Sequence, residues 1–184
     1  FKLGEIKENI SISTYQSNKS SKEQIINQAL KYHSEGNIAE AAKYYRYFIN
    51  QGFKDFLVFS NYGAILNGLG KLQDAENFFR KAIELNPNFA EAHSNLGSIF
   101  RALGKLREAE VSLRTAIGLS PDFAEAYSNL GSILKDLGRL KEAEVSTRKA
   151  INLNPNDSLS HSNLGSILKD LGRLKEAEIS TRKA

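Results

Sequence analysis

The chain has 184 residues, of which 41% are hydrophobic and 25% charged, and its formal net charge is +4. Positive and negative side chains are interleaved, which is not the pattern of a nucleic-acid-binding arm or a polybasic membrane tail. Cysteine is absent, so disulfides and thiolate metal sites are excluded. No apolar run approaches the roughly 20 residues that a membrane span needs. We therefore expect a soluble, cytoplasmic protein that binds neither nucleic acid nor membrane.

Residues 1–21 differ in composition from the rest of the chain. Isoleucines and a tyrosine are mixed with polar residues, and the segment then becomes rich in serine and lysine. Two interpretations of this N-terminal extension stay open. It is either a partly disordered leader or an arm whose apolar side chains pack on the first helical unit. In both cases we expect the first helix to begin at Lys22.

From residue 22 onward the sequence repeats every 34 residues. The series are Gly36, Gly70, Gly104, Gly138 and Gly172; Asn27, Asn61, Asn95, Asn129 and Asn163; Ala41, Ala75, Ala109, Ala143 and Ala177; and Pro87, Pro121 and Pro155. Several residue types that stay in phase over successive cycles indicate an array of structural repeats. The predicted repeats are 22–55, 56–89, 90–123, 124–157 and 158–184. The last stops inside its second predicted helix, so we expect it to be truncated.

Each repeat is predicted to be a helical hairpin, most clearly over residues 124–157. Apolar residues between Glu125 and Leu137 recur with a period of about 3.6 residues, which indicates a first helix. Gly138 follows as a C-terminal glycine, and a second helix is expected over Leu140–Leu153. Asn154-Pro155 ends it, because proline cannot continue a helix. One hairpin cannot bury its apolar face alone, whereas a stack of hairpins can.

This pattern resembles the tetratricopeptide repeat (TPR). The family's eight signature positions fall on His93, Leu96, Gly97, Phe100, Ala109, Leu113, Ala116 and Pro121 in one repeat, and on Phe59, Tyr62, Gly63, Leu66, Ala75, Phe79, Ala82 and Pro87 in the repeat before it. The resemblance implies an all-α fold, a right-handed superhelical solenoid of antiparallel helix pairs. It also implies a scaffold that binds a protein or peptide ligand.

The match to the TPR pattern is weaker at both ends of the array. In the first repeat Ala29, Phe48 and Phe53 replace the signature glycine, the second alanine and the proline, so this repeat is degenerate. In the last two repeats Thr147 and Thr181 stand where a large apolar side chain is usual. We therefore expect the C-terminal repeats to pack less heavily than the N-terminal ones.

The first helix of each repeat carries a polar arc opposite its apolar arc. In the TPR family the first helices line the concave side, so the resemblance implies that this polar arc faces a groove. The arc holds serines such as Ser94, Ser98, Ser128 and Ser132, and the asparagines of the series given above. Asparagine inside a helix costs roughly half a kcal/mol against alanine, so its recurrence needs a reason.

A chemical reason is that a primary amide both donates and accepts hydrogen bonds, and can therefore match the main chain of an extended peptide. Such an asparagine ladder is similar to the groove of TPR arrays of the O-linked N-acetylglucosamine transferase type. The alternative is that the asparagines are inherited, or that they bond a neighbouring helix. The candidate peptide-binding residues are Asn27, Asn61, Asn95, Asn129 and Asn163, together with the cations Arg101, Lys135 and Lys169, which favour an acidic peptide.

A carboxylate clamp of the kind that binds chaperone tails fits this sequence badly. That clamp needs a lysine at the fifth position of its first repeat and an asparagine at the ninth. Here these positions hold Ile26 and Leu30. The second helices carry Glu and Arg four residues apart, a spacing that supports an isolated helix and is expected on a solvated outer face. The pairs are Glu76–Arg80, Glu110–Arg114, Glu144–Arg148 and Glu178–Arg182.

No group of residues has the spacing of a catalytic site. His93 and His161 occupy the aromatic signature position and are expected to pack, while His33 stands alone. No glycine-rich phosphate loop joins a strand to a helix. We expect no enzyme activity, cofactor or metal. Two rival interpretations are a substrate-presenting segment of a larger group transferase, and a solenoid that self-associates through a last helix that exposes Ala177, Ile179 and Ala184.

Overall fold

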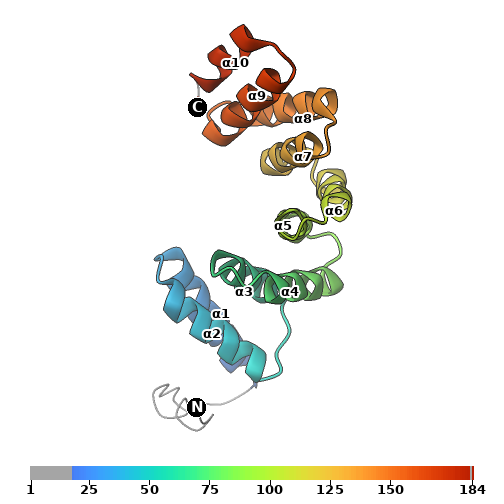
Figure 1. The fold of residues 1–184 in the computed structure, drawn as a ribbon. Helices are drawn as coiled ribbons and strands as arrows, with labels where there is room; N and C mark the ends of the chain where they lie inside the picture. The colour runs from blue at the N-terminus through green and yellow to red at the C-terminus, as the bar shows by residue number, and fades with distance from the viewer. Residues whose placement is uncertain (1–17, 183) are drawn as a thin grey trace. The chain divides into compact units, whose positions relative to one another are not determined.

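The computed structural model describes residues 18–182 and 184, and the expectations for residues 1–17 lie outside them. The described residues form ten α-helices and no strand, which confirms the all-α prediction (Figure 1). The helices are α1 (Asn18–Ser34), α2 (Ile38–Asn50), α3 (Phe56–Gly68), α4 (Leu72–Leu85), α5 (Ala90–Ala102), α6 (Leu106–Leu119), α7 (Ala124–Asp136), α8 (Leu140–Leu153), α9 (Ser158–Asp170) and α10 (Leu174–Thr181). Helix α1 thus begins four residues before Lys22.

The chain divides into two compact units, Phe1–Phe53 and Lys54–Ala184. The division falls next to the predicted boundary between the first two repeats. No helix within residues 18–182 is long and apolar enough to cross a membrane.

The described part of the first compact unit is the hairpin of α1 and α2. Ala29 and Ala41 are fully buried, so small side chains let the two helices approach. The Tyr45 side chain is also fully buried, and its hydroxyl lies 3.1 Å from Nδ1 of His33. The expectation that His33 stands alone is therefore wrong, because the degenerate repeat uses it to hold a buried tyrosine.

The second compact unit contains four successive hairpins, α3–α4, α5–α6, α7–α8 and α9–α10. The first helices α3, α5, α7 and α9 contact one another in succession, and α4, α6 and α8 each pack on the first helix of the next hairpin. We call the layer of first helices the inner layer and the layer of second helices the outer layer. The core between them is built from buried side chains such as Phe79, Ile99, Leu113 and Ile133.

The turn inside each hairpin is set by the glycine series. Gly138 has φ +75°, in the left-handed region that glycine adopts without a steric penalty. The next amide, that of Arg139, donates to the carbonyl of Leu134 at 2.8 Å, which closes the end of α7 in a Schellman-type cap. Helices α7 and α8 end within one residue of the predicted bounds, so the helix signals in this repeat are confirmed.

A second glycine series marks where the two helices of a hairpin touch. A Cβ added at Gly63 would lie 3.2 Å from the Phe79 ring, whereas one added at Gly131 would lie 2.1 Å from Oγ1 of Thr147. Thr147 is fully buried and its hydroxyl donates to the carbonyl of Ala143 at 2.9 Å. The fourth repeat therefore packs with Thr147, a smaller side chain than Phe79, as expected. It nevertheless leaves less space for a Cβ at its glycine.

Candidate peptide-binding face

The polar side chains of the inner layer meet in a hollow between α5 and α7. Ser98 and Arg101 come from α5, and Asn129 and Asp136 come from α7. Arg101 Nε lies 2.7 Å from Oδ2 of Asp136, and Asn129 Nδ2 donates to Oγ of Ser98 at 3.5 Å. Two predicted binding residues thus lie together, and both bond the adjacent repeat.

The same kind of connection recurs between α7 and α9. Lys135 Nζ donates to Oγ of Ser166 at 2.7 Å and lies 3.5 Å from Oδ2 of Asp170. Asn163 Nδ2 donates to Oγ of Ser128 at 3.4 Å. No other hydrogen bond joins the carboxamides of Asn129 or Asn163 to a described residue, so each keeps its oxygen and one N–H for other partners.

The remaining predicted residues occupy different surroundings. Asn61 and Asn95 are partly buried in α3 and α5. Asn27 is exposed on α1 and belongs to the first compact unit, whereas the other four asparagines belong to the second. Lys169 is exposed on α9 and has no ion pair with any described residue, unlike Arg101 and Lys135.

Several serines of the polar arc do not face a groove, contrary to expectation. Ser94 is 1% exposed and Ser128 2% exposed, because neighbouring first helices pack over them. Ser128 Oγ accepts from Oγ of Ser160 at 2.9 Å. One repeat earlier Ala126 stands in place of Ser160, and the buried hydroxyl of Ser94 has no hydrogen-bond partner among the described residues.

The outer layer has its own ion pairs between repeats. Glu110 is bound by Arg114 at 2.8 Å, as its spacing predicts, and also by Arg139 of the next hairpin at 2.7 Å. The same arrangement joins Glu76 to Lys105 and Glu144 to Arg173, at 3.4 and 2.7 Å. The expectation of a solvated face is wrong for these glutamates, because the Glu110 side chain is only 16% exposed.

These contacts change how the glutamates titrate. Burial by itself would raise the pKa of Glu110, but hydrogen bonds from Arg114 and Arg139 and the charges of both outweigh it, so the pKa lies below its ordinary value. Glu144, between Arg148 and Arg173, has a lowered pKa for the same reasons. The glutamates stay ionised at neutral pH and link consecutive repeats.

Sequence reasoning missed these connections because it searched for partners within one helix. The signal was nevertheless in the chain: Arg101 to Asp136 and Lys135 to Asp170 are both pairs of opposite charge 35 residues apart. Glu110 to Arg139 and Glu144 to Arg173 are both 29 residues apart. In a chain with a 34-residue period, opposite charges at a constant spacing close to that period indicate contacts between repeats.

Of the histidines at the aromatic signature position, His161 is buried, as predicted, whereas His93 is only partly buried, and both form hydrogen bonds. His93 Nε2 donates to the carbonyl of Pro87, and His161 Nε2 donates to that of Pro155, both at 2.9 Å. Each ring ties its first helix to the loop before it. Within residues 18–182 and 184, no three His, Asp or Glu side chains lie close enough to hold a metal ion.

The last hairpin does not expose all the residues predicted for an open end. Ala177 is only 7% exposed, because it packs with Leu164 and Leu168 inside the α9–α10 hairpin. Ile179 is 59% exposed and Ala184 is exposed. The expectation is therefore wrong for Ala177, which faces the core of its own repeat.

Helical hairpins with a 34-residue period, a glycine at each inner turn and a polar inner layer define a TPR solenoid, and TPR-like folds commonly serve as protein-interaction scaffolds. Residues 26–184 match the family described as the Cilia and flagella-associated protein 70 middle TPR-like domain, and the chain belongs to this family. No curated protein matches the chain.

Solved structures of similar fold cover most of the chain. MamA from Desulfovibrio magneticus RS-1 has a TM-score of 0.76 at 23% identity, over 92% of this chain and 94% of that one. TTC0263, a thermophilic TPR protein of Thermus thermophilus, has a TM-score of 0.73 at 19% identity, over 89% of each chain. PilF of Pseudomonas aeruginosa has a TM-score of 0.77 at 18% identity, over 90% of this chain and 75% of that one. These likenesses concern the fold alone.

Proposed function

We propose that the second compact unit binds an extended peptide along its inner layer, with the peptide main chain held by the carboxamides of Asn61, Asn95, Asn129 and Asn163. The supporting observation is that Asn129 and Asn163 each use a single N–H, in a long bond to a serine. The oxygen and second N–H of each amide are the complementary pair that a peptide group needs. The proposed arrangement is the one that a resemblance to TPR arrays of the O-linked N-acetylglucosamine transferase type implies.

The cations divide into two kinds within this proposal. Arg101 and Lys135 are paired with Asp136 and Asp170, so a peptide carboxylate must compete for them. Lys169 has no ion pair with a described residue. We therefore place the acidic end of the peptide next to Lys169. An exposed lysine acts through a screened charge, so its contribution falls as salt rises.

The test uses a peptide selected from a library against the whole chain, and a scrambled version of it. Replacing Asn95, Asn129 and Asn163 by alanine should weaken binding of both peptides by about 0.5–1.5 kcal/mol for each lost hydrogen bond. Thermal stability should be unchanged or slightly raised, because alanine is the better helix former. A triple variant that binds as well as the parent, or that unfolds at a markedly lower temperature, would make these residues structural.

Lys169→Ala and Lys135→Ala form a matched pair for the charge preference. Lys169→Ala should weaken acidic peptides more at low salt than at high salt, while Lys135→Ala should have the smaller effect because Lys135 already has partners. Equal effects at all salt concentrations would contradict the placement of the acidic end.

Two alternative functions are proposed beside this one, the first on the inner layer and the second at α10. In a larger group transferase the bound peptide would be the substrate of a catalytic domain. In a self-associating solenoid the ligand would be a second copy, favoured by the exposure of Leu174 and Ile179 on α10. Sedimentation over a range of concentrations separates the second case, since peptide binding alone predicts a monomer.

A further inference from the structure

Two grooves lie in the outer layer of the second compact unit, one repeat apart. The first has α6 and α8 as walls and α7 as floor, and the second has α8 and α10 as walls and α9 as floor. Equivalent positions line both. The pairs that matter here are Tyr127 and His161, Leu130 and Leu164, Leu134 and Leu168, and Ser146 and Ser180.

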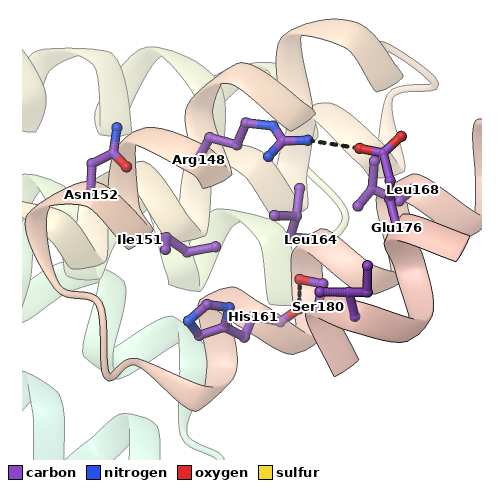
Figure 2. Close-up of a pocket in the computed structure, with 9 residues that line it drawn as sticks. Arg148, Ile151, Asn152, His161, Leu164, Leu168, Glu176 and Ser180 are labelled. Atoms are coloured by element: carbon purple, nitrogen blue, oxygen red, sulfur yellow. Dashed lines mark hydrogen bonds and ion pairs between the residues drawn. The ribbon is translucent and has the colours of Figure 1, made fainter. Parts of the chain in front are cut away.

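Each groove has an apolar floor and a charged rim. Figure 2 shows the second groove, with Leu164 and Leu168 on α9 and Ile151 on α8. Arg148 and Glu176 form an ion pair of 3.6 Å above them. In the first groove Val145 is an apolar wall residue that is 70% exposed. Exposed aliphatic surface beside buried leucines is the usual lining of a site for an apolar group.

In the second repeat a phenylalanine occupies the position at which the two grooves have a serine. Phe78 on α4 stands where Ser146 and Ser180 stand in the fourth and fifth repeats. The centroid of its ring lies 5.9 Å from that of Phe59 and 5.0 Å from that of Tyr62. These two residues correspond to Tyr127 and Leu130 in the first groove, so the ring lies where that groove is open.

The serines leave this space unfilled because they turn to the main chain. Ser146 Oγ donates to the carbonyl of Tyr127 at 2.9 Å, and Ser180 Oγ donates to that of His161 at 3.0 Å. Both hydroxyls have a hydrogen-bond partner, and neither serine side chain has the bulk of the Phe78 ring. The grooves are therefore sites for an aromatic side chain that the fourth and fifth repeats themselves lack.

The rim of the first groove adds a preference for negative charge. Lys81 Nζ lies 5.0 Å from the centroid of the Phe78 ring, and Lys149 occupies the same position in the fourth repeat. Lys141 and Lys149 both line the first groove, and neither forms an ion pair with a described residue. A lysine above the groove stabilises a ring below it through the ring's negative face, and two uncompensated lysines attract carboxylates.

We propose that the two outer grooves bind a protein partner through aromatic side chains, with one ring in each groove and with carboxylates beside the ring in the first groove. This surface lies on the outer layer, and its residues are different from the asparagines and cations of the inner layer. A scaffold with both surfaces binds two partners at once.

The test begins with three short synthetic peptides and the whole chain. The first carries phenylalanine between glutamates, the second alanine in place of phenylalanine, and the third lysines in place of the glutamates. The first peptide should bind about tenfold more tightly than either of the others, because each loses one of the two contributions. Equal binding of the alanine peptide would overturn the aromatic site, and equal binding of the lysine peptide would overturn the charge preference.

Variants then place the binding in the grooves. Ser146→Phe combined with Ser180→Phe should fill both grooves as Phe78 fills its own position, and should lower the affinity for the first peptide about tenfold or more. Val145→Asp and Lys149→Glu should also lower the affinity for the first peptide. Both residues are exposed, so these substitutions should disturb folding little. The matched control, Asn129→Ala with Asn163→Ala, tests the inner layer and should leave the preference for the first peptide over the other two unchanged.

Three results would overturn the proposal. The first is that the groove-filling and rim variants bind the first peptide as the parent does. The second is that the asparagine variant loses the preference for the first peptide over the other two, which would place that preference on the inner layer. The third is a concentration-dependent dimer that Ser146→Phe dissociates, which would make a second copy of the chain the occupant. Because the asparagine variant tests the inner layer alone, failure of either proposal leaves the other standing.

Discussion

Residues 56–89 and 124–157 form the same hairpin with different side chains at the contact between its two helices. The second repeat has two adjacent aromatic residues on α4. Phe79 is buried against Gly63, and Phe78 makes a tilted ring contact with Phe59 and an edge-to-face contact with Tyr62. The fourth repeat has Ser146 and Thr147 at these positions, and both hydroxyls donate to main-chain carbonyls. The backbone of the repeat therefore does not require a large core residue. A polar side chain can replace the ring if its hydroxyl has a hydrogen-bond acceptor.

The largest loss of stability should come from replacing Phe79 of the second repeat by threonine, the residue at the same position in the fourth repeat. Phe79 is almost fully buried, so Phe79→Thr should destabilise the chain by about 3 kcal/mol through the lost ring and the cavity left behind. Thr147→Phe is the reciprocal change and should cost about 1–3 kcal/mol, since no space faces Gly131. Urea unfolding followed by circular dichroism measures both. A neutral Phe79→Thr would show that the two repeats do not differ in how their cores are stabilised.

A smaller loss of stability should follow from replacing the helix-contact glycines by alanine, and it should differ between the two repeats. Gly131→Ala places a Cβ 2.1 Å from Thr147 Oγ1 and 3.2 Å from the carbonyl of Ala143, so it should cost about 2 kcal/mol. Gly63→Ala meets the Phe79 ring at 3.2 Å and should cost less. Gly118→Ala, in α6 with nothing within 4 Å, is the control and should stabilise by about 0.5–1 kcal/mol. If Gly131→Ala matches this control in thermal unfolding, the packing around Gly131 admits a methyl group without cost.

The smallest effect should come from the outer-layer ion pairs, which differ between the repeats in their cation. The pKa of Glu144 is lowered in the folded chain, so its contribution is present above the pKa of the unfolded chain and is lost as the pH falls through the folded value. Glu144→Gln should therefore cost about 1 kcal/mol at neutral pH and reduce the loss of stability on acidification.

Glu178→Gln is the matched control for this prediction. Glu178 is paired with Arg182 at 2.6 Å on the same helix, and its side chain is 64% exposed. Glu178→Gln should therefore cost less stability than Glu144→Gln. Thermal unfolding at a series of pH values compares the two, and identical pH profiles would mean that the contact of Glu144 with Arg173 contributes nothing.

Most of the fold could be predicted from the sequence, because its signals are local. Gly138 and Asn154-Pro155 end their helices wherever the hairpin lies, and the spacing of Leu130 and Leu134 defines a buried face. The inner layer could be predicted only in part. The burial of Ser128 and the bond from Lys135 to Ser166 depend on how closely two hairpins approach, which no single helix encodes.

The outer grooves could not have been found from any one repeat. Ser146 and Ser180 are unremarkable residues at the surface of a helix until the ring of Phe78 shows the volume that they leave empty. The relevant signal is a difference between repeats at one register, whereas the search for a repeat emphasises what the copies share. The functional information in such an array lies in the departures from its consensus.

The ion pairs between repeats also have a mechanical consequence. In a solenoid each hairpin contacts only its neighbours, so a small rotation between hairpins accumulates along the array. Here Arg101 with Asp136 bridges the inner layer, and Glu110 with Arg139 bridges the outer layer, so the two bridges act on opposite sides of the same joint. The inner pair is the more exposed and is weakened first by salt. We therefore expect the second compact unit to bend more easily between hairpins as the ionic strength rises.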